Sequence, residues 1–260
     1  MSRFLRKKII LKSPAEIEQM REAGAIAARA LRIAGEAVEP GISTLEIDAI
    51  AESVIREAGA IPTFLGYQGF PNSICASINS EIVHGIPSKT VRLGFGDIFT
   101  IDVGATYKGW IGDNANTFPV GEIDEQSQRL IDVTRAALYA GIEQCVPGNR
   151  LGHVSKAIGK VGRDADMGII QVLCGHGVGK AMHEEPSVPN EYDRRLGMGP
   201  ELKPGMVIAI EPMFTLGTDD VALRSDGWTY VTTDGSRAAQ IEHTIAITEE
   251  GPLILTEEQA

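Results

Sequence analysis

Five residues whose side chains can bind metal ions lie inside apolar or glycine-rich stretches of this 260-residue chain. Four of them carry carboxylates, which are almost never fully buried unless they are paired or bound to a cation. Two divalent cations would supply four positive charges against these carboxylates. The pattern therefore indicates a hydrolase with two metal ions. In chain order, the five residues are Asp102, Asp113, His176, Glu211 and Glu242.

Strands are predicted to position the four carboxylates. Asp102 and Asp113 flank residues 105–109, which we predict to be the loop of a hairpin. Side chains on antiparallel arms alternate with period two, so both carboxylates can reach one face. Glu211 ends one apolar run and Glu242 precedes another, which predicts that both lie on core strands.

His176 stands between glycines, which let the backbone approach a ligand closely. One imidazole with four carboxylates suits Mn, Fe, Co or Zn. Two such ions about 3.5–4 Å apart can share a hydroxide, which attacks an amide carbonyl. Taken alone, each of the five residues would be an ordinary turn, surface or core residue, so the inference rests on their combination.

Composition and charge argue against several other classes of protein. The formal net charge of −11 argues against DNA and general nucleic-acid binding. No apolar run reaches the roughly 18 residues that cross a membrane. Cys75, Cys145 and Cys174 form no CxxC pair, so we predict neither a zinc finger nor a disulfide framework. A cytoplasmic location fits these thiols best.

Residues 1–12 form a basic segment without an acidic residue. We predict a solvated tail that leads into the first element. Weak contact with an RNA surface and a cleaved transit peptide are the alternatives, and the helix cap at Ser13 leaves little room for a transit peptide. The apolar stretch in this segment is too short for the core of a signal peptide.

Capping signals predict two pairs of helices. Residues 13–16 and 43–46 are capping boxes, and Asp124 caps a third helix. A Pro-Gly pair precedes the second helix and another precedes the fourth, and strand-rich sequence follows each pair of helices. We therefore predict one domain, residues 13–260, with two halves at about 13–120 and 124–260. The halves would pack about a pseudo-twofold axis, with the site in the crevice between them.

Seven motifs together resemble the type I methionine aminopeptidases, from the first capping box almost to the C-terminus. The resemblance implies the α+β pita-bread (creatinase/aminopeptidase) fold, in which two pseudo-symmetric halves surround a central antiparallel sheet. The motifs are IVHGIP at 82–87, IDV at 101–103, GD at 112–113, CGHGVG at 174–179, HEEP at 183–186, IEPM at 210–213 and QIEHT at 240–244.

The resemblance also implies a role for each metal-binding residue. Asp102 would chelate one ion, and His176 and Glu211 would hold the other. Asp113 and Glu242 would bridge the two ions. Glu211 would also take part in proton transfer.

Further residues of the implied site contact the substrate. His84 and His183 match the two histidines of the family that are not ligands but contact the substrate and stabilise the tetrahedral intermediate. Apolar residues would line the pocket for the methionine side chain, although each alone would be ordinary core. The pocket residues are Tyr67, Phe70, Cys75, Met182 and Trp228, with Phe64 nearby. The chain departs from the family's usual pattern at Gln68, Ser80, Asn114 and Met182.

The implied activity is removal of the initiator methionine from nascent proteins and peptides when the second residue is small. A hydroxide activated by two metal ions (Co, Mn, Fe or Zn) would attack the first peptide bond. We expect a cytoplasmic monomer that acts on peptide or nascent protein N-termini, contacts the ribosome transiently, and binds neither DNA nor membranes.

Two other functions remain open at this point. A pita-bread peptidase that cleaves before proline would usually carry an additional N-terminal domain, for which there is no room before Ser13. A non-catalytic binding module would typically have lost ligands, and all five are present here.

Overall fold

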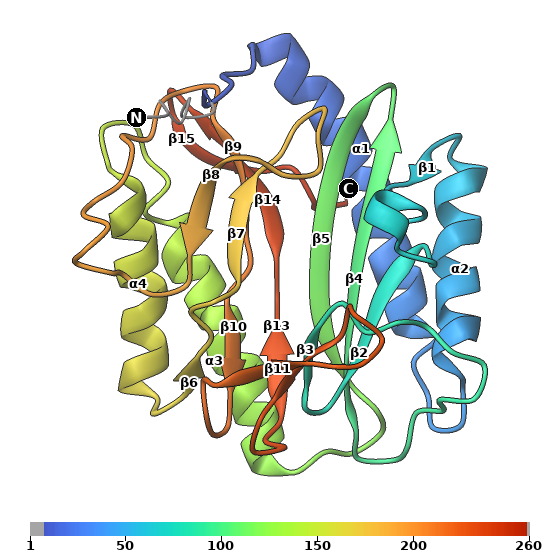
Figure 1. Cartoon of the computed structure of the whole chain (residues 1–260). Helices are drawn as coiled ribbons and strands as arrows, with labels where there is room; N and C mark the ends of the chain where they lie inside the picture. Colours follow the sequence, from blue (N-terminus) through green and yellow to red (C-terminus); the bar gives the residue numbers. More distant parts are fainter. Residues whose placement is uncertain (1–7, 259–260) are drawn as a thin grey trace, which may run out of the picture.

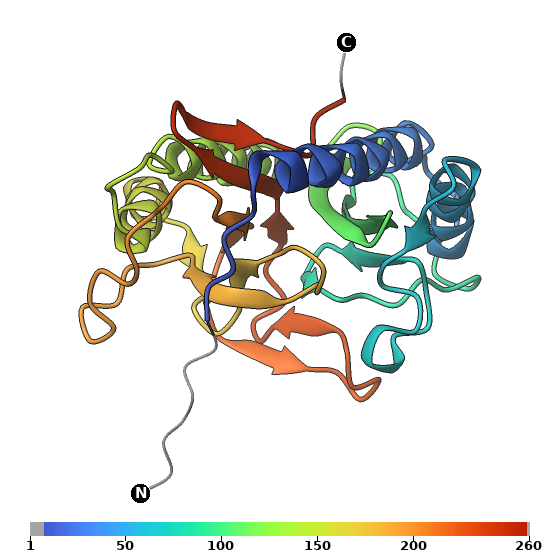
Figure 2. The same ribbon diagram turned by 90° about the horizontal axis from the view of Figure 1, so that it is seen from above.

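The computed structural model describes residues 8–258 (Figure 1). Its helices flank strands that run through the middle of the molecule. Seen from above, α1 lies along one side of the strands, and the orange hairpin of β11 (Val221–Leu223) and β12 (Tyr230–Thr232) lies on the opposite side (Figure 2). The α-helices are α1 (Pro14–Glu36), α2 (Thr44–Glu57), α3 (Glu125–Ile142) and α4 (Leu151–Asp164).

The three predicted side-chain caps are present. The hydroxyl of Ser13 accepts a hydrogen bond from the Glu16 N–H at 3.3 Å, and the Ser13 N–H donates to the Glu16 carboxylate at 2.8 Å. Ser43 and Glu46 form the same capping box at the start of α2. Asp124 caps α3. These bonds satisfy backbone N–H groups that have no partner within the helix, so they confirm the predicted helix starts.

The predicted hairpin forms from β4 (Ile98–Tyr107) and β5 (Trp110–Pro119), but its turn is tighter than predicted. Most of the predicted loop belongs to β4, and only Lys108 and Gly109 turn. Their φ angles of 51° and 80° are both positive, as in the two-residue turn whose twist matches that of the strands. The prediction was wrong because Tyr107 pairs with Trp110 and extends the ladder.

Strand β4 has antiparallel partners on both of its edges. One edge pairs with β5, and the other pairs with β1 (Ile61–Pro62) and β2 (Ile74–Ile78). Helices α1 and α2 pack on this sheet, because their apolar faces and the strands share one buried cluster. A short 3-10 turn, η1 (Tyr67–Gly69), stands between β1 and β2.

A five-stranded antiparallel sheet forms from the later part of the chain. A second buried cluster joins this sheet to α3 and α4. In the strand-rich sequence predicted after the second pair of helices, residues 168–174 form strand only at their two ends. The strand order is β15 (Gly251–Ile254), β14 (His243–Thr248), β9 (Val207–Ile210), β7 (Cys174–Gly177) and β8 (Glu184–Pro189).

Two smaller sheets complete the arrangement. In one, β10 (Met213–Thr215) pairs with β13 (Ala238–Gln240) and β6 (Gly168–Ile169). In the other, β12 pairs with β11 and β3 (Glu81–Val83). The second small sheet therefore joins the segment that precedes His84 to the segment that follows Trp228.

Hydrogen bonds between β5 and the chain around Glu242 join the two large sheets. Thr244 accepts from the Asp113 N–H at 3.1 Å and donates to the Asp113 carbonyl at 2.8 Å. The Glu242 N–H donates to the Ala115 carbonyl at 2.8 Å. We call this junction the β5 seam, and it brings the carboxylate of Asp113 on β5 close to that of Glu242, just before β14.

The prediction of a solvated tail over residues 1–12 is wrong at Lys12. Residues 1–7, which hold three of its five basic side chains, lie outside the described residues. Lys12 is buried and paired with Glu184, so it belongs to the folded domain. Among the described residues, no helix combines the length and the apolarity needed to cross a membrane.

Candidate metal centre

The hairpin β4–β5 places Asp102 and Asp113 on one face. Asp113 pairs across the ladder with Gly104, which is two residues from Asp102 on β4. Side chains two residues apart on a strand share a face, so the two carboxylates lie together as predicted. Both are buried and both line the same cavity.

His176 extends from β7 towards the carboxylates of the β5 seam. Its Nδ1 lies 2.9 Å from the carbonyl oxygen of Gly177. A carbonyl can only accept, so Nδ1 carries a proton and donates it. Nε2 then faces Asp113 Oδ2 at 3.5 Å and Glu211 Oε1 at 3.7 Å. A backbone carbonyl on one ring nitrogen is the usual way to aim the other nitrogen at a metal ion.

The two glutamates were predicted to lie on core strands. In the structure, each lies just outside the end of a strand. Glu211 follows β9, and Glu242 stands between β13 and β14. Gln240 donates a hydrogen bond from its amide to Glu211 Oε2 at 2.9 Å. The β5 seam fixes the backbone of Glu242, and this fixes the direction from which its side chain enters the site.

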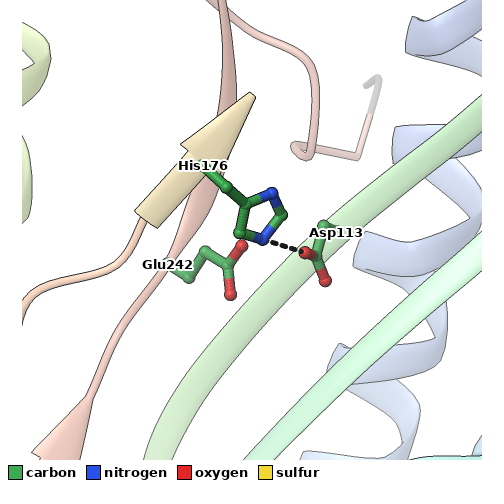
Figure 3. A group of neighbouring side chains, drawn as sticks. All are labelled: Asp113, His176 and Glu242. Atoms are coloured by element: carbon green, nitrogen blue, oxygen red, sulfur yellow. Dashed lines mark ion pairs between the residues drawn. The ribbon is translucent and has the colours of Figure 1, made fainter. Parts of the chain in front are cut away.

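Three of the five residues come especially close together. One ligand atom from each of Asp113, His176 and Glu242 lies within 4.8 Å of the others (Figure 3). Figure 3 shows the imidazole and both carboxylates pointing towards one another from three different elements. Such a group offers a metal ion one nitrogen and several oxygen ligands.

The largest effect on the pKa values of these carboxylates is burial without a nearby positive charge that fully compensates it. Burial, followed by the neighbouring carboxylates, raises the pKa of Asp102 and of Glu242 well above their usual range. Burial also raises the pKa of Glu211 to about 7, against the lowering effect of His176. Burial alone would lower the pKa of His176, but Asp113 and Glu211 outweigh it and raise this pKa to about 9.

Buried carboxylate oxygens that lack a hydrogen-bond partner test whether a cation fits this site. Oδ1 of Asp102, Oδ1 of Asp113 and Oε1 of Glu242 are buried and find no hydrogen-bond partner within residues 8–258. A buried acceptor without a partner is costly, and several of them lining one cavity point to a bound ligand. Divalent cations would satisfy these oxygens and hold the carboxylates ionised, so the donor set fits metal ions.

All of the predicted site residues line one cavity of about 170 Å³. The five predicted metal-binding residues form one part of its wall, and the remainder is largely aromatic or sulfur-containing. Gln68, one of the departures from the family pattern, also lines it. The other lining residues are Phe64, Tyr67, Phe70, Cys75, His84, Met182, His183 and Trp228.

His84 and His183, which are outside the predicted ligand set, differ in what fixes their positions. His84 has a φ of 60°, which is uncommon for a residue with a side chain and marks stored backbone strain. His183 shares a hydrogen bond of 2.7 Å with the Tyr67 hydroxyl, and its ring centroid lies 4.4 Å from that of His176. Burial is the main cause that lowers the pKa of both histidines, to about 4 for His183.

The sequence interpretation did not include Gln240 and Glu184 in the site. Gln240 orients Glu211, and Glu184 anchors the loop that carries His183. Gln240 had a detectable signal, since it is a polar residue in an apolar strand two positions before Glu242. Glu184 lies in the HEEP motif at 183–186, but nothing indicated its pairing with Lys12, which is remote in the sequence.

Comparison with known proteins supports the metal centre. The model of metallopeptidase family M24 matches residues 18–249. A methionine aminopeptidase of Clostridium acetobutylicum is 49% identical over 248 residues, which are 95% of this chain and 98% of that protein. The crystal structure of a methionine aminopeptidase from Thermotoga maritima matches with a TM-score of 0.94 and 43% identity, covering 96% of this chain and 100% of its own.

A second type of peptidase shares the fold at lower similarity. The prolidase from Pyrococcus furiosus matches with a TM-score of 0.75 and 25% identity, covering 96% of this chain and 66% of its own. These neighbours confirm the predicted pita-bread fold. The higher identity to methionine aminopeptidases than to the prolidase favours the former. The chain belongs to metallopeptidase family M24 and, within it, to the methionine aminopeptidases.

Proposed function

We propose that this protein uses two divalent cations to remove the N-terminal methionine from peptides and nascent proteins whose second residue is small. One observation carries the proposal: the buried side chains of Asp102, Asp113, His176 and Glu242, with the mostly buried Glu211, surround a cavity whose other walls are largely apolar. Bound cations would offset the carboxylate charge, provide a nucleophile by lowering the pKa of a water, and polarise the scissile carbonyl. Co, Mn, Fe and Zn all suit these ligands.

In the proposed centre, each ligand has a separate position. Asp102 would hold one ion, and His176 and Glu211 would hold the other. Asp113 and Glu242 would contribute to both. The position of His176 supports this assignment, because its Nε2 faces both Glu211 and the bridging Asp113.

Glu211 is proposed to move the proton as well as to bind an ion. Gln240 holds one carboxylate oxygen of Glu211, which leaves the other oxygen facing His176 and the cavity. A carboxylate fixed in this way can accept a proton from the attacking water and deliver it to the leaving amine. Such a general base acts best when it lies within hydrogen-bond reach of the proton.

His183 and His84 are proposed to contact the substrate and to stabilise the tetrahedral intermediate. Burial keeps His183 neutral at pH 7, since its pKa is about 4. We infer that the Tyr67 hydroxyl donates to Nδ1, so that the proton of His183 is on Nε2 and available to a substrate oxygen. Preorganised donors of this kind stabilise the charge that develops on the oxygen.

The apolar end of the cavity is proposed to bind the methionine side chain. Phe70 and Trp228 meet edge to face with their ring centroids 5.1 Å apart, beside Met182 and Cys75. A thioether makes favourable contacts with aromatic edges. The cavity of about 170 Å³ equals about six water volumes, which limits it to one side chain of moderate size.

The cellular setting is part of the same proposal. We propose that the enzyme is a cytoplasmic monomer that meets nascent N-termini at the ribosome through transient contacts. Cosedimentation with translating ribosomes tests the contact, and sedimentation equilibrium tests the monomer.

Peptide hydrolysis tests the proposed function. Metal-stripped protein is supplied in turn with Mn, Co, Fe or Zn and incubated with Met-Ala-Ser, Leu-Ala-Ser and Ala-Pro-Ala. We expect metal-dependent release of methionine from the first peptide and little reaction with the other two. Cleavage of Ala-Pro-Ala alone would assign the chain to the proline-specific peptidases. No release with any metal would leave a binding module as the surviving hypothesis.

A further inference from the structure

A buried ion pair lies behind the loop that carries Met182 and His183. Lys12 Nζ is 2.6 Å from Glu184 Oε2, and the side chains are only 2% and 8% exposed. Lys12 immediately precedes the helix cap Ser13, whereas Glu184 begins β8. Burying both charges is costly, so the pair must be well compensated where it occurs.

Glu184 also organises the loop itself. Its other oxygen, Oε1, accepts hydrogen bonds from the backbone N–H groups of Lys180 at 3.1 Å and Ala181 at 3.3 Å. The carboxylate therefore closes residues 180–184 into a tight turn. Met182 and His183 are the two residues of this turn that line the cavity.

The ion pair packs directly against the loop backbone. A Cβ placed on Gly179 would lie 2.6 Å from Glu184 Oε1 and 2.7 Å from Lys12 Cε. No side chain fits there, so the lysine stem and the carboxylate touch the loop without a gap. The Gly179 carbonyl in turn accepts from the Ile111 N–H on β5 at 3.0 Å.

Lys12 is itself fixed to the five-stranded sheet. Its backbone N–H donates to the Gly205 carbonyl at 2.7 Å, and the Gly205 N–H donates to the Ile247 carbonyl on β14 at 2.9 Å. A continuous chain of contacts therefore runs from β14 through Gly205, Lys12 and Glu184 to the loop. Because both ends are held, the loop has little freedom to shift relative to the cavity.

We propose that Lys12 is a positioning residue that acts through Glu184 to hold Met182 and His183 against the bound N-terminal methionine. The inference rests on the proposed role of His183 in the reaction. His183 touches the substrate, and Lys12 does not. A displacement of about 1 Å in a group that contacts the reacting atoms can cost about 10²-fold in rate.

Lys12→Met tests this, because methionine keeps much of the stem and loses the charge. The control is Lys160→Met, which removes an exposed ion pair with Asp164 on α4. In metal-loaded enzyme we expect Lys12→Met to lower kcat for Met-Ala-Ser by about 10²-fold with metal content unchanged. Lys160→Met should match the wild type.

A double-mutant cycle separates positioning from a general loss of structure. In a His183→Ala background, Lys12→Met should lower kcat clearly less than in the wild-type background, because only its effect through Met182 remains. Wild-type kcat in folded Lys12→Met, or an equal loss in both backgrounds, would overturn the inference. Failure of the wild type to release methionine, or an inert His183→Ala substitution, would instead count against the proposed function.

A second variant covers the case in which Lys12→Met does not fold. Lys12→Met combined with Glu184→Gln leaves no uncompensated buried charge and still lacks the ion pair. This double variant should fold and keep the lowered kcat. Normal kcat in it would overturn the inference, and failure of both variants to fold would do the same by assigning the pair to folding alone.

Discussion

Nε2 of His176 lies 3.5 Å from Oδ2 of Asp113, although β7 and β5 belong to different sheets. Neither sheet alone assembles the metal centre. The hydrogen bonds of the β5 seam hold the sheets together at the place where the ligands meet. Metal binding and the junction of the two sheets therefore stabilise one another, as expected for a site made from remote segments.

Loss of a proposed bridging carboxylate should remove metal and activity together. Asp113→Ala and Glu242→Ala each open both metal positions, so we expect kcat to fall by at least about 10³-fold and metal content to fall with it. Metal analysis and methionine release check this on the same samples. Asp132→Ala, at an exposed carboxylate on α3, is the control. Near-normal turnover in either bridging variant would refute the two-metal assignment.

His84 should affect turnover without affecting metal. We choose His84→Asn, because asparagine tolerates the positive φ of 60° better than other residues that have a side chain. Loss of the imidazole should lower kcat by about 10²-fold, the lower range for a group that moves or shares a proton. Metal content should stay at the wild-type value. Loss of metal in this variant would show that His84 is a ligand.

Gly24 in α1 should not tolerate a side chain. A Cβ there would lie 2.1 Å from the Leu255 carbonyl oxygen, which is backbone and cannot easily move. Alanine in a helix normally stabilises by about 1 kcal/mol relative to glycine, but overpacking costs about 1–3 kcal/mol and should win here. Thermal unfolding of Gly24→Ala should therefore occur at a lower temperature than in the wild type.

Gly159→Ala in α4 is the matched comparison for Gly24→Ala. The atoms nearest to its added Cβ belong to the end of the Glu191 side chain, which can swing away at the expense of its exposed partner Arg163. We expect a change in stability within about 1 kcal/mol, set by helix propensity. Equal destabilisation by the two substitutions would show that the close approach of α1 to Leu255 has no special importance.

The cysteines should differ in reactivity, with a defined pH dependence. Burial raises the pKa of Cys145 to about 12. Since the thiolate is the reactive form, only about 10⁻⁴ of this thiol is ionised at pH 8, and labelling should accelerate about tenfold per pH unit. Cys174 is less buried and should react first. Mass spectrometry of timed samples measures this, with denatured protein as the reference in which all three react alike.

The helix starts and the side chains that gather in the cavity could be predicted because both depend on local signals. The caps at Ser13, Ser43 and Asp124 satisfy N–H groups within three residues of themselves. The candidate ligands were recognisable because charged residues in apolar surroundings need compensation. The family motifs then assigned each ligand an individual role.

Features that depend on remote contacts could not be predicted in the same way. The turn at Lys108–Gly109 depends on how far the β4–β5 ladder extends, and composition does not determine that length. The burial of Lys12 depends on Glu184, which is far away in the sequence. A basic segment usually remains in solvent, so the local pattern gave no reason to expect this pairing.

The most direct test of the central claim is a crystal structure of the manganese-loaded protein with anomalous scattering recorded for the metal. The account predicts two peaks about 3.5–4 Å apart in the cavity. One peak should contact Asp102, the other should contact His176 and Glu211, and both should contact Asp113 and Glu242. Absence of any peak at these side chains, in protein that releases methionine with manganese, would contradict the proposed centre.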